Sequence, residues 1–84
     1  MRTKHKRTLK DIFHDPILSN VKWKDVESLF EALGAEVEEG RGSRVRILLR
    51  NQVAVFHRPH PRKETDKGAL VSARKFLMEV GIIP

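Results

Sequence analysis

The sequence predicts an α+β fold of two layers, in which helices cover one face of a three-stranded antiparallel sheet. Three observations lead to this prediction. A helical stripe of apolar residues lies in the first half of the chain, and a second one lies near its C-terminal end. Between them, short segments alternate apolar and polar residues with the period of two that is typical of strands. The predicted order is helix, helix, three strands, helix.

The first predicted helix is short and follows a basic stretch. Leu9, Ile12 and Phe13 have helical spacing. The helix is expected to end before Pro16, because a proline disfavours the helical conformation of the residue that precedes it. Thr3 and Thr8 are both possible caps for its start. Residues 1–7 read MRTKHKR, and we expect a solvated, partly frayed extension in preference to an ordered arm that touches nucleic acid. We therefore divide the chain into a basic N-terminal extension, residues 1–20, and a main domain, residues 21–84.

The second predicted helix begins near Trp23 and has the clearest pattern in the chain. Val26, Leu29, Phe30 and Leu33 occupy one helical stripe, and Gly34 follows where helices commonly end in a left-handed residue. Trp23 is expected to pack against the core, as a large aromatic side chain at a helix start usually does. A short strand over Ala35–Glu39 follows.

The stretch Arg41–Leu49 reads RGSRVRILL and predicts a strand with two different faces. Val45, Ile47 and Leu49 alternate with Arg44, Arg46 and Arg50, so one face joins a core and the other points positive charge outward. Gly40 and Gly42 allow a tight turn before this strand, and Ser43 adds a hydroxyl group. The stretch is therefore a candidate site for a phosphate.

A third strand is predicted at Val53–His57, joined to the second by a short connection that favours an antiparallel hairpin. If the turn consists of Asn51 and Gln52, Arg46 faces His57 on the side of the sheet away from the core. A change of one residue in the loop would undo this pairing.

The remaining chain is predicted to form a rigid loop and a last helix. The loop, His57–Glu64, reads HRPHPRKE, and Pro59 and Pro61 restrict its backbone. Asp66–Gly68 leads into the helix, whose stripe consists of Leu70, Ala73, Leu77 and Val80, with Gly81 and Pro84 at its end.

Composition narrows the class of protein. The chain has 84 residues, a formal charge of +6 and no cysteine, which suits one small basic domain without disulfides or the usual zinc sites. The charge favours a polyanionic partner, and nucleic acid is the first candidate. The apolar runs are much too short to span a bilayer, so no membrane association and a cytoplasmic location are expected.

Three segments together resemble the HicA family of toxins from type II toxin-antitoxin systems. They read LFEALGAEV, GRGSRVRI and RPHPRKETDKGAL, and the resemblance extends roughly from Trp23 to Val80. It implies a fold similar to a double-stranded-RNA-binding domain, to which the predicted N-terminal helix is an addition. It also implies a ribonuclease that cleaves mRNA without a metal or other cofactor and is held inactive by a HicB-type antitoxin.

One position departs from the pattern of that family. The family's glycine and serine match Gly42 and Ser43, but Arg44 stands where a catalytic histidine is usual. Arginine cannot act as the base that RNA cleavage needs, because it stays protonated, although it can grip a phosphate. Histidine suits the proton transfers. The candidates are His60, which matches the loop histidine of the family, and His57, which the hairpin geometry favours.

Positively charged residues are predicted to converge on the hairpin and its exit loop, with few acids near them. The predicted RNA-binding residues are Arg41, Gly42, Ser43, Arg44, Arg46, Arg58, Arg62 and Lys63, with Arg50 nearby. His5 and His14 are expected to be surface residues, and no spacing of histidines suggests a metal site. An antitoxin that binds this surface should carry acidic residues.

Two other functions fit the sequence. The first is a nucleic-acid-binding module of the same fold whose catalysis is weakened or lost, which the arginine at position 44 suggests. The second is a pure interaction protein whose basic face serves an acidic protein partner. Binding that falls steeply with salt separates nucleic acid from a protein partner.

Overall fold

The computed structural model describes residues 1–60 and 62–84. Within them the chain has the predicted α+β fold. Its elements are α1 (Thr3–Ile12), α2 (Trp23–Ala32), β1 (Glu36–Glu39), β2 (Arg44–Leu49), β3 (Gln52–His57) and α3 (Lys67–Glu79). The strands form an antiparallel sheet in the order β1-β2-β3. No helix in this part of the chain is both long and apolar enough to cross a membrane.

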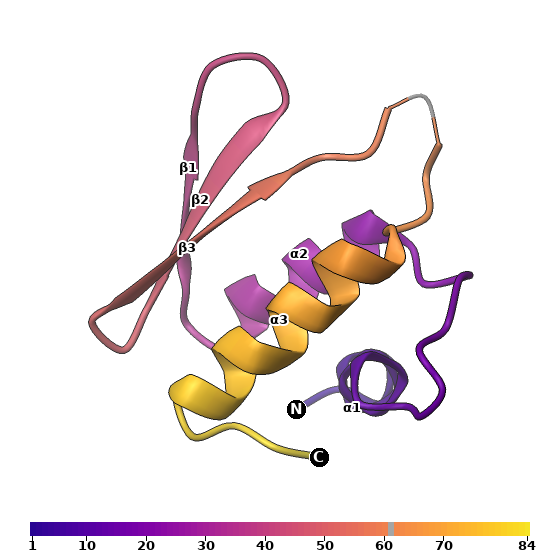
Figure 1. The fold of residues 1–84 in the computed structure, drawn as a ribbon. Helices are drawn as coiled ribbons and strands as arrows, with labels where there is room; N and C mark the ends of the chain where they lie inside the picture. Colours follow the sequence, from indigo (N-terminus) through magenta and orange to yellow (C-terminus); the bar gives the residue numbers. More distant parts are fainter. Residues whose placement is uncertain (61) are drawn as a thin grey trace.

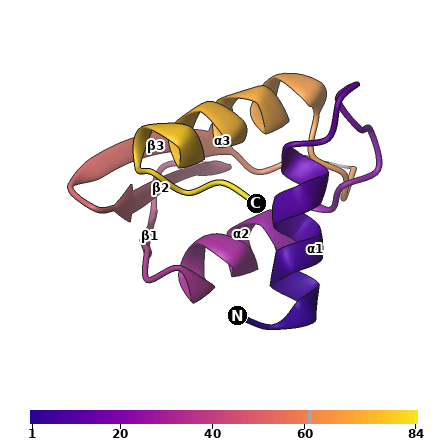
Figure 2. The ribbon, with the colours of Figure 1, turned by 90° about the horizontal axis from the view of Figure 1, so that it is seen from below.

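The elements are arranged in layers. Figure 1 shows α2 and α3 side by side, covering one face of the sheet. The view from below in Figure 2 places α1 on the side of these two helices that faces away from the sheet. The three strands and helices α2 and α3 thus make the two-layer sandwich that the sequence predicts, and α1 is added to it.

The core forms where the apolar faces of the sheet and the helices meet. Val45, Ile47 and Leu49 of β2 are buried, as their alternation predicts, while Arg44 and Arg46 are exposed. Aromatic rings from both layers pack at the centre. The ring centroids of Phe30 and Phe56 are 5.9 Å apart, and those of Phe30 and Phe76 are 5.8 Å apart.

The predicted stripes of α2 and α3 are confirmed, except that their last members, Leu33 and Val80, are the residues directly after each helix. Trp23 is buried, and its ring centroid lies 5.3 Å from that of Phe56. Gly34 and Gly81 follow α2 and α3 with φ of +95° and +80°, a conformation that glycine adopts without the strain of a side chain. At the start of α3, the Asp66 side chain accepts a hydrogen bond of 2.7 Å from the Ala69 N–H.

The N-terminal residues differ from the prediction. The expectation of a frayed extension over residues 1–7 was wrong for Thr3–Arg7, which form the first turns of α1. Neither Thr3 nor Thr8 caps the helix, because Arg2 is at the N-cap position and α1 begins at Thr3. Thr8 is buried within α1, and its hydroxyl donates to the Lys4 carbonyl at 3.0 Å. The helix persists because Leu9 and Ile12 are buried in the same core as α2 and α3.

Polar contacts also hold α1 against the other helices. The Arg74 guanidinium of α3 donates to the carbonyl oxygens of Ile12 and His14, at 2.9 and 2.6 Å. It also lies 5.8 Å from the centroid of the Phe13 ring. Arg74 thus satisfies carbonyl groups at the C-terminal end of α1. On α2, the Asp25 carboxylate lies 3.4 Å from the Lys4 ammonium of α1.

The β2–β3 turn also differs from the prediction. It consists of Arg50 and Asn51, with φ of +50° and +65°, and not of Asn51 and Gln52. The pairing shifts by two residues, so His57 lies opposite Arg44 and not opposite Arg46. A shift of two keeps Arg44, Arg46 and His57 on their predicted face, because the period of a strand is two. Arg50 was predicted on that face as well, but it lies in the turn and binds the Val80 carbonyl at the end of α3.

The strand limits shift slightly as well. β1 begins at Glu36, one residue later than predicted, and β3 begins at Gln52, one residue earlier. Residues 41–43 belong to the turn before β2, which begins at Arg44. Of the prolines predicted to stiffen the exit loop, Pro61 lies outside the described residues.

We expect α1 to contribute to the stability of the whole domain. The Ile12 side chain is fully buried, so Ile12→Ala should lower the free energy of unfolding by about 2–5 kcal/mol. The control is Lys10→Ala on the exposed face of α1, which should change it by less than about 0.5 kcal/mol. Urea denaturation measures both. Equal effects of the two variants would mean that α1 is not part of the cooperative fold.

Candidate nucleic-acid interface

The turn between β1 and β2 presents backbone and positive charge to solvent. The Gly40 N–H donates to the Arg44 carbonyl at 2.9 Å, and the Arg44 N–H donates to the Arg41 carbonyl at 3.1 Å. A side chain at Gly40 would meet the Arg44 carbonyl at 3.1 Å, a tight contact, and Gly42 has a φ of +61°, so glycine suits both positions of the turn. Arg41, Gly42 and Ser43 are exposed at its tip.

Arg44 and His57 lie opposite each other on the exposed face of the sheet, where β2 meets this turn. The Arg58 N–H donates to the Ser43 carbonyl at 2.8 Å, which extends the β2–β3 ladder by one pair. Hydrogen-bonded and non-hydrogen-bonded pairs alternate in such a ladder, so the Arg44–His57 pair is of the closer, non-hydrogen-bonded kind. Its Cα atoms are typically about 4.5 Å apart. An imidazole and a guanidinium therefore share one exposed site.

Two other arginines of the hairpin contact the protein itself. The Arg46 guanidinium lies 3.3 Å from the Glu38 carboxylate on the neighbouring strand, in an exposed ion pair. At the other end of the sheet, the Arg50 guanidinium donates to the Val80 carbonyl at the end of α3, at 2.7 Å. The expectation that few acids lie near these arginines was wrong. Glu38 pairs with Arg46, and Arg58 has two carboxylate partners.

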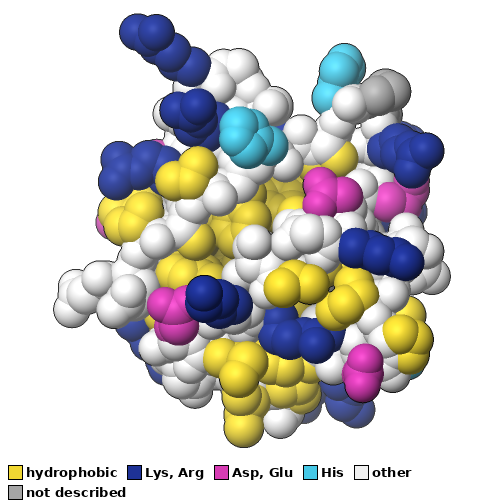
Figure 3. Space-filling view, viewed as in Figure 1, with side chains coloured by type: hydrophobic (Ala, Val, Ile, Leu, Met, Phe, Trp, Pro, Cys, Tyr) yellow, Lys and Arg dark blue, Asp and Glu magenta, His cyan; other side chains and the backbone are white. Residues whose placement is uncertain are grey.

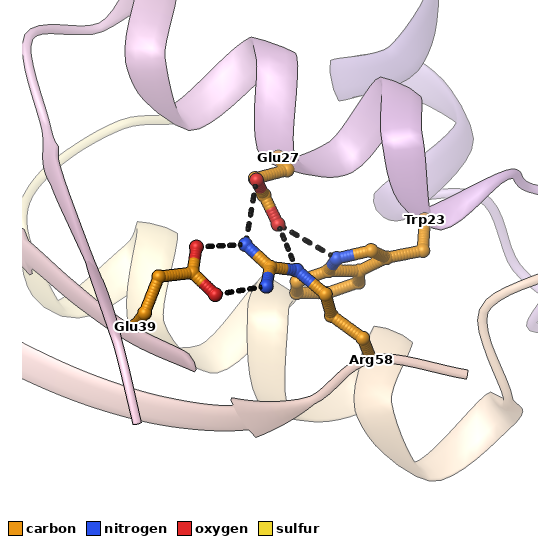
Figure 4. Close-up of polar contacts among 4 residues, drawn as sticks. All are labelled: Trp23, Glu27, Glu39 and Arg58. Atoms are coloured by element: carbon orange, nitrogen blue, oxygen red, sulfur yellow. Dashed lines mark hydrogen bonds and ion pairs between the residues drawn. The ribbon is translucent and has the colours of Figure 1, made fainter. Parts of the chain in front are cut away.

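Arg58 is clamped between two carboxylates, as Figure 4 shows. Its guanidinium donates to both Glu27 oxygens, at 3.0 and 3.1 Å, and to both Glu39 oxygens. The Trp23 indole N–H donates to Glu27 at 2.9 Å. We call these four residues the Arg58 clamp. It joins α2, the end of β1 and the first residue after β3, and only 31% of the Arg58 side chain is exposed.

The clamp changes the ionisation of its members. Hydrogen bonds from Arg58, aided by its positive charge, lower the pKa of the exposed Glu39 carboxyl. Hydrogen bonds to Glu39, and then those to Glu27, raise the pKa of Arg58 further above its already high value. Each guanidinium nitrogen of Arg58 donates to a carboxylate, so its positive charge is compensated within the protein.

The far end of the exit loop is tied to the start of α2. The Trp23 N–H donates to the Lys63 carbonyl at 3.0 Å, and the Thr65 N–H donates to the Val21 carbonyl at 2.7 Å. Lys22 and Glu64 form an isolated antiparallel bridge between the same two segments. The loop that carries His60 is therefore held at one end by the Arg58 clamp and at the other by residues 21–23.

A hollow beside this loop brings together basic residues from distant parts of the sequence. Arg62 and Lys63 from the loop and Lys22 and Lys24 from the start of α2 line it, with Trp23 and Glu31 among the other lining residues. The sequence did not predict that Lys22 and Lys24 lie beside this loop. They flank Trp23 in the sequence, but nothing local indicates that the loop some 40 residues later folds back onto them.

The predicted site residues thus fall into two groups. Arg41, Gly42, Ser43, Arg44, Arg46 and His57 lie at the β1–β2 turn and on the exposed sheet face. Arg58, Arg62 and Lys63 line the hollow, where Arg58 is held by its two carboxylates. His60 is exposed on the loop between Arg58 and Arg62. Figure 3 shows Lys, Arg and His side chains gathered over the β1–β2 turn and the neighbouring end of the sheet.

The other histidines lie outside these groups. His14 is exposed, and its Nδ1 lies 2.8 Å from the Pro16 carbonyl oxygen. His5 is half-buried on α1, so the expectation that it is a surface residue holds only in part. Among residues 1–60 and 62–84, no group of three or more histidine or carboxylate side chains is placed to hold a metal ion.

The fold and the site together define the class of protein. Helix α2, the antiparallel three-stranded sheet and helix α3 form a domain like those that bind double-stranded RNA, with a basic turn and an arginine–histidine pair exposed at one end of its sheet. The chain belongs to the HicA toxin family, since the model of that family, described as the HicA toxin of bacterial toxin-antitoxin systems, matches residues 23–82.

The family match covers most of the chain and confirms the resemblance drawn from the sequence. It starts at the first residue of α2, so α1 lies outside it. The chain is accordingly a toxin of the toxin-antitoxin type, and an antitoxin is its implied partner. Searches of curated proteins and of solved structures gave no match.

The Arg58 clamp should stabilise the domain more than the exposed Arg46–Glu38 pair does. Arg58→Gln removes charged hydrogen bonds at a half-buried position and should lower the free energy of unfolding by about 1.5–3 kcal/mol. The matched control Arg46→Gln should cost less than about 1 kcal/mol, because exposed ion pairs contribute little. Urea denaturation at neutral pH measures both. Similar losses in the two variants would contradict the special role of Arg58.

The clamp also predicts a pH dependence. The pKa of Glu39 is lower in the folded than in the unfolded chain, so its contribution is complete above the unfolded pKa and is lost as the pH falls through the folded pKa. In Arg58→Gln, the pKa of Glu39 should rise toward its ordinary value. Carboxyl-carbon NMR titration measures this change. A Glu39 pKa that does not move in the variant would show that another group lowers it.

Proposed function

We propose that this toxin cleaves mRNA without a metal ion and is neutralised by a HicB-type antitoxin. The observation that carries the proposal is the pairing of His57 with Arg44. The usual catalytic histidine of the family is absent at position 44, but His57 lies directly across the strand pair from it. A histidine on β3 can therefore reach the same exposed site that a histidine on β2 would occupy.

The proposed chemistry is an attack by the ribose 2′-hydroxyl on the adjacent phosphorus. His57 accepts the hydroxyl proton, since histidine can accept a proton near neutral pH. The 2′-oxygen forms a bond to phosphorus while the bond to the 5′-oxygen breaks, and the leaving oxygen takes a proton from a general acid. The products are a 2′,3′-cyclic phosphate and a 5′-hydroxyl. His60, on the exit loop, is the candidate for the general acid.

Arginine at position 44 has a different task in this proposal. Its guanidinium is always charged and offers paired N–H donors, which suit the phosphate oxygens as negative charge grows on them. Exposed residues of the β1–β2 turn, Arg41, Gly42 and Ser43, extend the contact along the RNA backbone. Arg62 and Lys63 contact the RNA backbone at the hollow, together with Lys22 and Lys24, which line the same hollow.

In this proposal the Arg58 clamp does not bind RNA but fixes the position of the exit loop. Arg58 was predicted to bind RNA, but its donors already bind Glu27 and Glu39, so we assign it the role of holding the loop that carries His60. We also propose that the toxin domain is residues 21–84, to which the basic helix of residues 1–20 adds core packing, and that the protein acts in the cytoplasm.

A nucleic-acid-binding module without catalysis is the second candidate. The exposed Arg44, at the position of the usual histidine, is the observation that favours it, because an arginine keeps affinity for phosphate but cannot act as a base. Both candidates predict binding that weakens steeply with salt. They differ only in whether the RNA is cut.

Cleavage of RNA by the purified protein, in a chelator and at low salt, tests the proposal. His57→Ala should lower the cleavage rate by about 100-fold or more and leave RNA affinity within about threefold, because a general base contributes on that scale. Arg44→Ala should reduce both rate and affinity. The matched control is His14→Ala, an exposed histidine outside the interface, which should change neither.

Three outcomes would revise the proposal. Binding without any cleavage by the wild type would favour the non-catalytic module. A large loss of rate in His60→Ala together with an active His57→Ala would move the base to the exit loop. Absence of both RNA binding and cleavage would reject a nucleic-acid function for this surface.

A further inference from the structure

The two edges of the sheet are protected to very different degrees. β1 is four residues long, and three of them, Glu36, Glu38 and Glu39, are exposed glutamates. β3 is six residues long, and its stretch Gln52–Phe56 carries no charge. Short strands and charged side chains are the usual protection of an edge against another chain. The β1 edge has both features, whereas the β3 edge has neither.

The backbone of β3 also has free hydrogen-bonding groups along this edge. The ladder bond from the Arg58 N–H to the Ser43 carbonyl fixes which residues of β3 face β2. Because alternate residues point to opposite sides, Val53, Val55 and His57 direct their N–H and C=O groups away from β2. In the described part of the chain no other strand lies on that side. Three residues thus offer donors and acceptors in the pattern that a further strand would use.

A hollow lies next to the free edge. Val55, Phe56 and His57 of β3 line one side, and Asp66, Ala69 and Ser72 at the start of α3 line the other. The side chains of Ala69 and Ser72 are small, and the Asp66 carboxylate is turned to the Ala69 N–H. Figure 3 shows hydrophobic side chains at the surface between the sheet and α3. A groove between a strand edge and a helix is a known way to receive an extended peptide.

The exposed side chains indicate what kind of strand fits. Val53 and Val55 are 50% and 51% exposed on the outer face of β3, so an added strand should place β-branched or other apolar residues beside them. Arg44 and Arg46 lie on the same face one strand further in, and the chain carries a net charge of +6. Acidic residues at the ends of the added strand complement this charge. A second copy of this basic chain would not.

We infer that the β3 edge, with the hollow beside α3, receives an extended apolar strand with acidic flanks from the antitoxin. The inference rests on the proposed function in one respect, since that function supplies the partner. It adds how the partner docks and why docking inhibits. His57 is one of the three residues whose backbone the added strand would bind, so the same contact that holds the antitoxin covers the proposed catalytic base.

A designed peptide tests the edge without the antitoxin. The probe is a capped peptide of alternating valine and threonine with a glutamate at each end. NMR should show slower amide hydrogen exchange at Val53, Val55 and His57 by at least about tenfold when the peptide is in excess. The same peptide with lysine ends should bind more weakly, because its charge is wrong. A version with N-methylated amides, which lacks the donors, should give no protection.

Two variants of this chain make the test specific. Val55→Pro removes an N–H that does not pair with β2, so it should fold and yet lose the protection by the peptide, as proline is tolerated on edge strands. Val55→Lys keeps the N–H but places a charge on the edge, and it provides the same test if the proline variant does not fold. Met78→Lys, an exposed apolar residue on α3 away from the hollow, is the matched control and should bind the peptide normally.

Several results would overturn the inference. Protection of β1 amides in place of those of β3, or equal binding of the lysine-ended peptide, would contradict the edge or the charge assigned to the partner. A dimer of the free chain whose Val53 and Val55 amides are already protected would assign the edge to a second copy. RNA takes no part in this experiment, so failure of RNA cleavage and failure of strand addition are separate outcomes.

Discussion

The position of the exit loop depends on the Arg58 guanidinium and the two carboxylates that hold it. Glu27 comes from α2, Glu39 from the end of β1, and Arg58 itself follows β3, so one side chain joins the helical layer, an edge of the sheet and the exit loop. A half-buried charge of this kind is stable only if its hydrogen bonds are complete, and here the Trp23 indole also helps to orient Glu27. The clamp therefore fixes where the loop with His60 begins.

This arrangement separates two basic surfaces and gives them different surroundings. On one side, the β1–β2 turn and the Arg44–His57 pair are exposed at the end of the sheet. On the other, Arg62, Lys63, Lys22 and Lys24 line the hollow beside α2. The clamp borders this hollow, which Trp23, Glu27 and Arg58 help to line, and its positive charge is compensated. The open β3 edge adjoins the first surface at His57, so the proposed chemistry and the inferred docking of a partner strand meet at one residue.

The sequence predicted the elements well, because each stripe and each alternation is a local pattern. Val45, Ile47 and Leu49 had to face a core once they formed a strand, and Gly34 marked the end of α2. The turn was missed because Arg50 and Asn51 adopt positive φ without a glycine to indicate it. The partners of Arg58 were missed for another reason. Glu27 and Glu39 are far from it in the sequence, and only the packed fold brings them together.

Amide hydrogen exchange in wild type and Glu27→Gln tests most directly whether the clamp holds the exit loop in place. The variant keeps the shape of the side chain but removes one of the two negative charges that bind Arg58. We predict faster exchange at the Arg58, Thr65 and Trp23 amides, whose bonds anchor the two ends of the loop, with little change at Leu77 in the core of α3. Unchanged exchange at the three loop anchors, or an equal acceleration at Leu77, would contradict this account.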